Sequence, residues 1–296
     1  MAFAPTLISK VILSLMSAAI LPPSYNQGMN REYPETISIP DGTISLTSPS
    51  DSSFAALSRT ILKTDTLPDT LAKNISCTAI ISNKGDKPVV ALSIVYKVTN
   101  QAGKDTINDM LFYSLDLNET ERMILHPGES RFITPLAANV FEYSSRYNTP
   151  MKFGTKNENV APSWCSNSKH ITIMIDAAVF ADGIIVGPDT TNTQDRLNGQ
   201  IQAISDISNE VLDLHKNAKP NEISMHVHSI ATSAPLNSEG KDKMKDTYYE
   251  VRQSYAALFE GYLQTHSEED LVNRYIYQIL NNPHVPLIHR SDKSTK

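Results

Sequence analysis

The stretch ITIMIDAAVFADGIIVGPD, residues 171–189, carries the clearest fold signal in the sequence. Its first half predicts a strand with one apolar face, which comprises Ile171, Ile173, Ile175, Ala177 and Val179. Asp-Gly at 182–183 is typical of a two-residue type I′ hairpin turn, and the apolar residues 184–186 would form the return strand. We therefore predict a hairpin in which the following residues serve backbone geometry: Asp182, Gly183, Gly187, Pro188 and Asp189.

The aspartates of the same stretch allow a second interpretation, in which it is a calcium-binding loop. Such a loop supplies oxygen ligands at close, alternating positions. Asp176, Asp182 and Asp189 are too far apart in the sequence for that pattern. The hairpin is therefore preferred, with Gly183 at positive φ, and no metal is expected at this turn.

Strand signals continue upstream of the hairpin. Residues 90–98 alternate without a break, and turn residues bound several shorter apolar runs. Short strands separated by frequent turns are typical of an antiparallel sandwich. The segments NISCTAIISNKGDKPVVALSIVYKVTN (74–100) and ILHPGESRFITPL (124–136) resemble the immunoglobulin-like or fibronectin-like modules of exported bacterial proteins. This resemblance implies a fold and no activity.

The hairpin carries a second resemblance. The pattern Phe-x-Asp-Gly-x-x-x-Gly-Pro-Asp at 180–189 is similar to a region of uncharacterised exported bacterial proteins, in which it leads into a helix. Ala178 stands where that region would have valine. The resemblance implies no reaction and no catalytic residue, and no cofactor is expected.

Downstream of the hairpin the apolar period changes from that of a strand to that of a helix. A helical stripe covers 197–214, with Asn192 as the predicted N-cap and Asp195 as its acidic partner. Residues 223–230 predict one short strand, and a second helical stripe covers 248–262. The predicted fold class is α+β: an antiparallel immunoglobulin-like β-sandwich followed by a mainly helical C-terminal part.

The N-terminus indicates export. An uncharged apolar run between Lys10 and Pro22 is too short to span a bilayer and fits a signal-peptide core with cleavage after Ala19. A buried or frayed helix is the alternative. The predicted organisation is a signal peptide at 1–19, a linker at 20–34, a β-sandwich domain at 35–189, a helical region packed on it at 190–290, and a tail at 291–296.

Composition restricts the class of partner. The 296 residues carry a net charge of −6, and no block of Lys or Arg stands out. Attraction to nucleic acid is therefore not expected, and neither is an integral membrane span in the mature chain. The expected location is the periplasm or the extracellular medium, with a protein or another envelope component as the partner.

Cys77 and Cys165 are the only cysteines. In an exported chain such a pair can form one disulfide, and closing a long loop would stabilise the fold by about 4–5 kcal/mol. Both could instead be buried free thiols, because two cysteines carry no spacing pattern.

His226 and His228 are the candidate metal ligands. Two positions apart on a strand, they would share one face, as a metal pair requires. A third ligand would have to come from His215, His284 or His289. Solvated histidines are the preferred interpretation.

The sequence contains no motif of a nucleophile, a phosphate-binding loop, a dinucleotide site or a zinc protease. Tyr248, Tyr255 and Tyr262 could form a stacking surface, although core packing is the preferred interpretation. The predicted function is a non-catalytic exported envelope or secreted protein with a binding or scaffolding role. The alternative is an extracytoplasmic hydrolase with its site at the sandwich–helix junction, where two carboxylates about 5–9 Å apart would be the signal.

Overall fold

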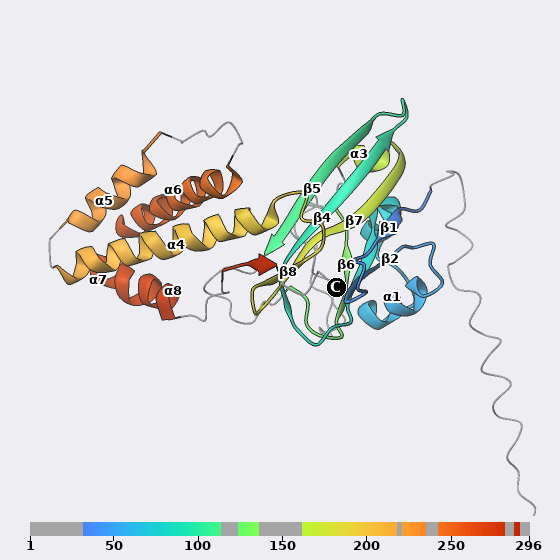
Figure 1. Ribbon diagram of the computed structural model, residues 1–296, viewed down its shortest axis with the longest axis horizontal. Helices are drawn as coiled ribbons and strands as arrows, with labels where there is room; N and C mark the ends of the chain where they lie inside the picture. The colour runs from blue at the N-terminus through green and yellow to red at the C-terminus, as the bar shows by residue number, and fades with distance from the viewer. Residues whose placement is uncertain are drawn as a thin grey trace, which may run out of the picture.

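The computed structural model describes residues 32–113, 124–135, 162–217, 221–234, 242–281 and 287–290. The predicted signal peptide, the linker up to residue 31 and the predicted tail at 291–296 lie outside these ranges. The described chain is mixed α+β, with two β-sheets at one end of an elongated molecule and a group of helices at the other (Figure 1). The α+β class is therefore confirmed.

The larger sheet is built around two long antiparallel strands, β4 (Val89–Asn100) and β7 (Ser168–Phe180). β5 (Asp105–Tyr113) flanks β4, while β1 (Glu35–Ile37) and β8 (Ile184–Val186) share the far side of β7. β4 is apolar at most of its positions, so its interior is buried on both faces. β1 pairs with β7 in parallel, contrary to the antiparallel arrangement predicted for the sheets.

A second sheet comprises β2 (Ile44–Thr47), β3 (Ala79–Asn83) and β6 (Ser130–Ile133), in the order β2-β3-β6. Its apolar side chains share one core with those of the larger sheet, where Ile81 and Ile94 are fully buried. The short helices around this core are α1 (Phe54–Leu62), α2 (Asp69–Lys73), η2 (Ile75–Cys77) and α3 (Ser163–Ser166).

A β-bulge in β7 changes the direction of its side chains at Asp176. This residue has no partner in β4, because consecutive β4 residues pair with Ala177 and Ile175 on either side of it. Side chains before the bulge, such as Ile173, face the core between the sheets, whereas Ala177 and Val179 face a second apolar cluster. The single apolar face predicted for this strand therefore breaks at Asp176.

The turn after β7 has three residues, 181–183, rather than the predicted two. The Gly183 N–H donates to the carbonyl oxygen of Phe180 at 2.9 Å, and Gly183 has the expected positive φ, +82°. Asp182 is not among the residues with positive φ, so the turn is not type I′. The turn is instead a three-residue hairpin loop whose last residue, Gly183, has the left-handed conformation.

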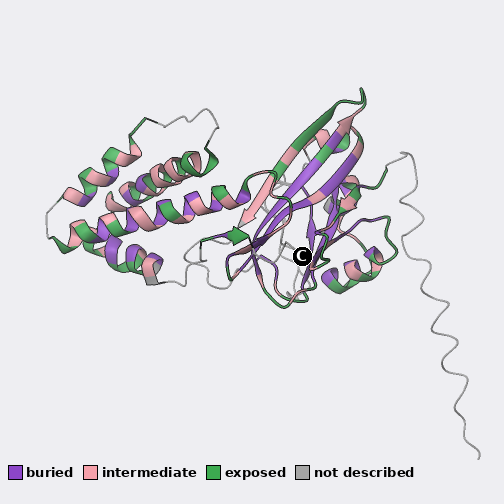
Figure 2. Cartoon of the chain, in the orientation of Figure 1, coloured by how far each residue is buried: buried purple, intermediate pink, exposed green. Residues whose placement is uncertain are grey.

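The helices at the other end of the molecule are α4 (Thr193–Lys216), α5 (Glu222–Ala231), α6 (Lys243–Leu263), α7 (Glu268–Leu271), the π-helix η3 (Val272–Ile276) and α8 (Tyr277–Asn281). Figure 2 shows their buried positions as stripes that alternate with exposed ones. Residues 223–230, predicted as a strand, form most of α5, so that prediction is wrong. Ile223 and Val227 are buried at helical spacing, and a short apolar run alone does not distinguish the two structures.

The first turns of α4 pack on the larger sheet. Leu197 is fully buried in an apolar cluster with residues of β4 and β7 and with Ile288. The Asn198 side chain hydrogen-bonds both backbone groups of Ile288, at 3.0 and 2.7 Å. β9 (His289–Arg290) follows and pairs with β8 in parallel, so these residues complete the sheet, although the sequence placed them in the helical region.

Gly187 provides a test of how tightly the chain turns after β8. Its φ is +106°, and an added Cβ would lie 2.5 Å from the backbone oxygen of Asp176. We expect Gly187→Ala to lower the free energy of unfolding by more than about 2 kcal/mol, because backbone strain and a clash combine. Gly103→Ala should cost only about 1 kcal/mol, since Gly103 has φ +77° but open space around it. Denaturant unfolding measures both, and equal losses would contradict the close approach.

Candidate functional site at the junction of sheet and helices

The carboxylate of Asp176 joins the sheet to the segment that leads into α4. Its Oδ1 accepts hydrogen bonds from the N–H of Thr190 at 2.8 Å and from the Thr190 hydroxyl at 2.6 Å. Its Oδ2 accepts from the N–H of Thr191 at 2.9 Å and from the Thr191 hydroxyl at 2.7 Å. Asp176 is only 2% exposed. Four donors therefore satisfy a buried carboxylate in its charged form.

Asp189 caps the start of α4. Its carboxylate accepts the first two N–H groups of the helix, at 2.6 and 3.3 Å. It adopts a left-handed conformation, with φ +58°, and its own N–H donates to the backbone oxygen of Asp176 at 2.8 Å. Asn192 occupies the predicted N-cap position directly before Thr193, but its side chain makes no cap hydrogen bond, so the predicted capping pair with Asp195 does not form. The acceptor for the first N–H groups of α4 is instead the side chain of Asp189.

These two carboxylates have pKa values shifted in opposite directions. Burial opposes the ionised form of Asp176, but the hydrogen bonds from Thr190 and Thr191 outweigh it and hold the pKa of Asp176 below its usual range. Burial raises the pKa of Asp189, and its backbone hydrogen bonds offset that effect only in part. Opposite shifts on neighbouring carboxylates are one signal of acid–base chemistry. Here both carboxylates are occupied by donors that hold the chain in place.

The same network reaches the neighbouring strand. The hydroxyl of Thr191 lies 3.0 Å from that of Ser93 on β4 and 3.0 Å from that of Thr193 at the start of α4. Ser93 and Thr193 are fully buried. Two strands and one helix are thus connected through a single buried set of hydrogen bonds.

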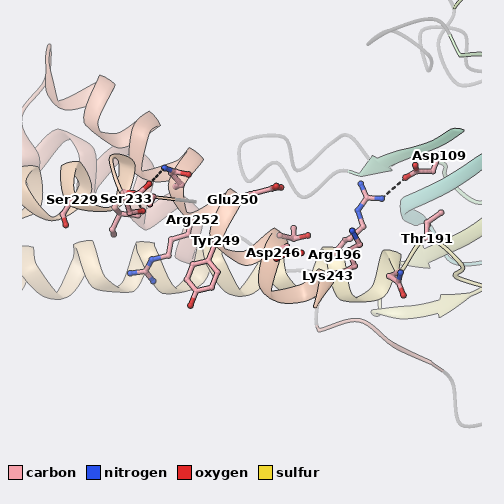
Figure 3. A pocket seen from close by; sticks show the side chains of 15 residues that line it. Asp109, Thr191, Arg196, Ser229, Ser233, Lys243, Asp246, Tyr249, Glu250 and Arg252 are labelled. Carbon is pink, nitrogen blue, oxygen red and sulfur yellow. Dashed lines mark hydrogen bonds and ion pairs between the residues drawn. The ribbon is translucent and has the colours of Figure 1, made fainter. Parts of the chain in front are cut away.

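A cavity of about 920 Å³ opens beside this network, between the larger sheet and the helices. Asp109 of β5 and the first residues of α4 bound one end, and the end of α5 and the first half of α6 line the remainder (Figure 3). Uncharged polar side chains of its lining include Thr191, Asn192, Thr247, Tyr249 and Gln253. Residues from both ends of the molecule therefore contribute to one hollow.

Charges in the cavity lining balance. Among the residues that the structure describes, the lining contains three cations and three carboxylates: Arg196, Lys243, Arg252, Asp109, Asp246 and Glu250. Arg196 pairs with Asp109 at 3.0 Å, a contact that a dashed line marks in Figure 3. Arg252 pairs with Glu210 of α4 at 2.7 Å and donates to the Tyr248 hydroxyl at 2.9 Å. The cavity therefore offers many directional groups and no net charge.

A close helix crossing fixes one wall of this cavity. Gly199 of α4 lies against the first turn of α6, where an added Cβ would clash with the backbone oxygen of Met244. The absence of a side chain at Gly199 lets the two backbones approach. The position of the α6 side chains that line the cavity depends on this contact.

His226 and His228 do not share a face. They lie on the helix α5, where positions two apart point to different sides. The ring of His226 lies 2.8 Å from a carboxylate oxygen of Glu210 on α4, and that of His228 lies 2.7 Å from one of Glu260 on α6. Across the described ranges, no cluster of metal-ligating side chains occurs, and the third-ligand candidate His284 lies outside them. Each histidine connects α5 to a neighbouring helix.

Cys77 and Cys165 form a disulfide, with their Cα atoms 6.0 Å apart. Both cysteines are buried, and the bond joins η2, which precedes β3, to α3, which precedes β7. The disulfide therefore connects segments that lead into different sheets.

The tyrosine stripe contributes to packing. Tyr255 and Tyr262 pack against the helical core, and the Tyr248 hydroxyl donates to Asp206 at 2.9 Å. The aromatic ring in the cavity belongs to Tyr249, which the sequence analysis missed because it lies beside the stripe. Charged residues at helical spacing around it, Asp246 and Glu250 among them, are the signal that marks this face of α6 as polar.

Comparison of the chain with models of protein families, with curated proteins and with solved structures finds no match. Among the residues that the structure describes, no helix has the length and apolar character needed to cross a membrane. The disulfide is compatible with a location outside the cytoplasm.

Asp176→Asn tests the buried network. The new amide cannot accept all the donors, so we expect the free energy of unfolding to fall by about 2–3 kcal/mol. Asp182→Asn is the matched control, because Asp182 is partly exposed, pairs with a partly exposed Lys87 and accepts one backbone hydrogen bond, from Ile184 at 3.2 Å, which an amide oxygen can also accept. It should cost less than about 1 kcal/mol. Urea unfolding of both variants decides, and similar losses would contradict the role given to Asp176.

The pH dependence of the stability of Asp176→Asn shows how much of its effect comes from the lost charge and how much from the changed hydrogen-bonding shape of the side chain. The pKa of Asp176 is lower in the folded state than in the unfolded state. Its carboxylate therefore raises the free energy of unfolding at pH values above the unfolded pKa, and this stabilisation is lost as the pH falls through the folded pKa. The stability gap between the parent and Asp176→Asn should therefore narrow from neutral pH to about pH 3. Asp189 is present in both proteins and largely cancels from the difference. A constant gap would mean that the charge of Asp176 contributes nothing.

Proposed function

We propose that this chain is an exported binding protein, without a catalytic role, that holds a polar and uncharged ligand in the cavity between the sheets and the helices. The observation that carries the proposal is the balanced set of charges in that cavity, supplied by elements from both ends of the molecule. Balanced charges create no long-range field, so recognition depends on directional hydrogen bonds. Hydroxyl-rich ligands such as carbohydrate chains have this chemistry.

Three features of the lining support a carbohydrate over a fatty acid or a phosphate ester. Planar side chains with several hydrogen-bonding atoms are frequent, including Asn192, Arg252 and Gln253. The partly buried ring of Tyr249 could stack on a sugar face. The apolar lining residues are few, Ile230 and Ala234.

The proposed location is outside the cytoplasm, and the proposed fold of the sheet part is immunoglobulin-like. The apolar run that ends near Ala19, together with the buried disulfide, supports export. Two sheets that share one core support the immunoglobulin-like description. The parallel pairing of β1 with β7 is a departure from it.

The hydrolase alternative has less support. The carboxylates with opposite pKa shifts, Asp176 and Asp189, are engaged by backbone and hydroxyl donors, and neither belongs to the cavity lining. Among the lining carboxylates, Asp109 already pairs with Arg196. We therefore propose binding rather than hydrolysis.

The ligand proposal is tested by saturation-transfer difference NMR with maltohexaose, cellohexaose and chitohexaose as probes. At least one probe should bind, and Tyr249→Ala should weaken its binding about tenfold, because a stacking surface is lost. Tyr277→Ala is the matched control, since Tyr277 is 39% exposed on α8 and lies outside the cavity lining. Failure of all three probes to bind, or equal effects of the two variants, would overturn the proposal.

Export is tested separately by expressing the full chain in a bacterial host. Protein recovered outside the cytoplasm should begin at Ile20, as determined by mass spectrometry of its N-terminal peptide. Leu13→Arg interrupts the apolar run and should retain the chain in the cytoplasm. Exported protein with an intact Met1 would show that this segment is not a cleaved signal peptide.

A further inference from the structure

β5 is the edge strand of the larger sheet. Within the described part of the chain it pairs with β4 alone, through nine consecutive residue pairs without a register shift. The N–H of Asn100 donates to the carbonyl oxygen of Lys104 at 3.0 Å, which sets the alternation of the ladder. The outward backbone groups therefore belong to Asp105, Ile107, Asp109 and Leu111.

Edge strands are normally short, bulged, charged, interrupted by Pro, or covered by a helix or loop. Among the residues that the structure describes, this edge has no bulge, no Pro and no covering element, and its only charges are those of Asp105 and Asp109. β5 spans Asp105–Tyr113, and its sequence DTINDMLFY contains neither Lys nor Pro. The side chain of Ile107, which lies between Asp105 and Asp109 on the same face of β5, is 69% exposed. At the opposite side of the sheet, the outer strands β1 and β9 have only three and two residues.

We propose that the outer edge of β5, which no described strand pairs with, accepts an extended segment of a partner polypeptide as an added antiparallel strand. Main-chain hydrogen bonds to the outward groups of β5 would supply the affinity, as in other cases of strand addition. The inference goes beyond the proposed ligand cavity, because it concerns the strand edge and stands whether or not the cavity holds a carbohydrate.

The side chains along the edge define the chemistry of that segment. Asp105, Ile107 and Asp109 alternate on one face of β5, so an added strand would place its own side chains beside theirs. The two carboxylates pair with Lys97 at 2.8 Å and with Arg196 at 3.0 Å, yet each remains 45% exposed. A segment with basic, apolar and basic residues at alternate positions is complementary to this pattern.

A second copy of this chain fits the edge less well. Twofold antiparallel pairing centred on Asp109 or on Ile107 would oppose carboxylates, whereas pairing centred on Asn108 would place Ile107 opposite Asp109 and leave both carboxylates without a cation from the other copy. Like charges directly opposite each other destabilise a strand pair. The net charge of −6 adds to the repulsion between copies. Charge complementarity therefore favours a basic partner segment.

The test uses the full mature chain and a capped, fluorescein-labelled peptide that alternates Thr with Lys, Val and Lys. Binding is measured by fluorescence anisotropy, together with amide hydrogen exchange of β5. The peptide should bind and slow exchange at the outward amides of Ile107 and Asp109. A peptide of the same composition with adjacent lysines, and one with Pro in place of a central Thr, should bind at least about tenfold more weakly.

Paired variants locate the site. Ile107→Lys places a positive charge on the edge and should weaken binding of the peptide at least about tenfold. Met225→Lys, at a residue that is 63% exposed on α5, should leave the affinity for the peptide unchanged. Tyr249→Ala should also leave the peptide affinity unchanged, which separates this inference from the cavity proposal. Equal binding of the Pro-containing peptide, or no effect of Ile107→Lys, would overturn the proposal. A dimer of the parent that Ile107→Lys dissociates would also overturn it, in favour of a second copy.

Discussion

The hydrogen bonds that Thr190 and Thr191 donate to Asp176 determine how the two ends of the molecule meet. A carboxylate inside a strand is costly to bury unless donors surround it. The bulge in β7 directs Asp176 away from its neighbours, and Gly187 lets the returning chain pass close to the strand. The segment after β8 thereby delivers its N–H groups and hydroxyls to the buried charge. Because that segment runs directly into α4, Asp176 fixes the position from which α4 leaves the sheet, while Asp189 accepts the first N–H groups of the helix.

The cavity and the edge strand both depend on this arrangement. α4 leaves the sheet from a fixed point and is held there a second time by Leu197 and by the contact of Asn198 with Ile288. α6 is then placed on α4 through the crossing at Gly199. The cavity lies where these helices face β5, so Asp109 contributes to the cavity while its backbone belongs to the outer edge of β5. The two proposed interaction surfaces therefore adjoin, although different atoms form them.

Local periodicity explains which elements could be predicted from the sequence. The strand through residues 90–98 and the helical stripes at 197–214 and 248–262 were recognisable because each repeats one period over many residues. Residues 223–230 were mistaken for a strand because eight residues span only about two helical turns, and an apolar run this short fits either structure. The bulge at Asp176 was not recognisable, because one extra residue in a ladder leaves no signal in apolar alternation.

The candidate site could be predicted only in part, because it is assembled from distant segments. The glycines and aspartates of 182–189 were recognised as residues of backbone geometry, and Gly187 has that role. The acceptor role of Asp189 at α4 was missed, since the expected cap lay three residues later, at Asn192. The ion pair of Arg196 with Asp109 joins residues 87 positions apart, and no local sequence pattern predicts such a pair.

The return of β9 to the sheet has a consequence for the order in which the molecule forms. β8 is made before the helices and β9 after them, and the contact between Asn198 and Ile288 spans 90 residues. A chain that emerges N-terminus first, whether from the ribosome or through a translocation channel, cannot complete this sheet until His289 and Arg290 have emerged. Contacts of such long range slow folding, because the loop must close before they contribute. Helices that fold first shorten the distance to be closed, so the helical part would act during folding as a spacer that brings β9 back to the sheet.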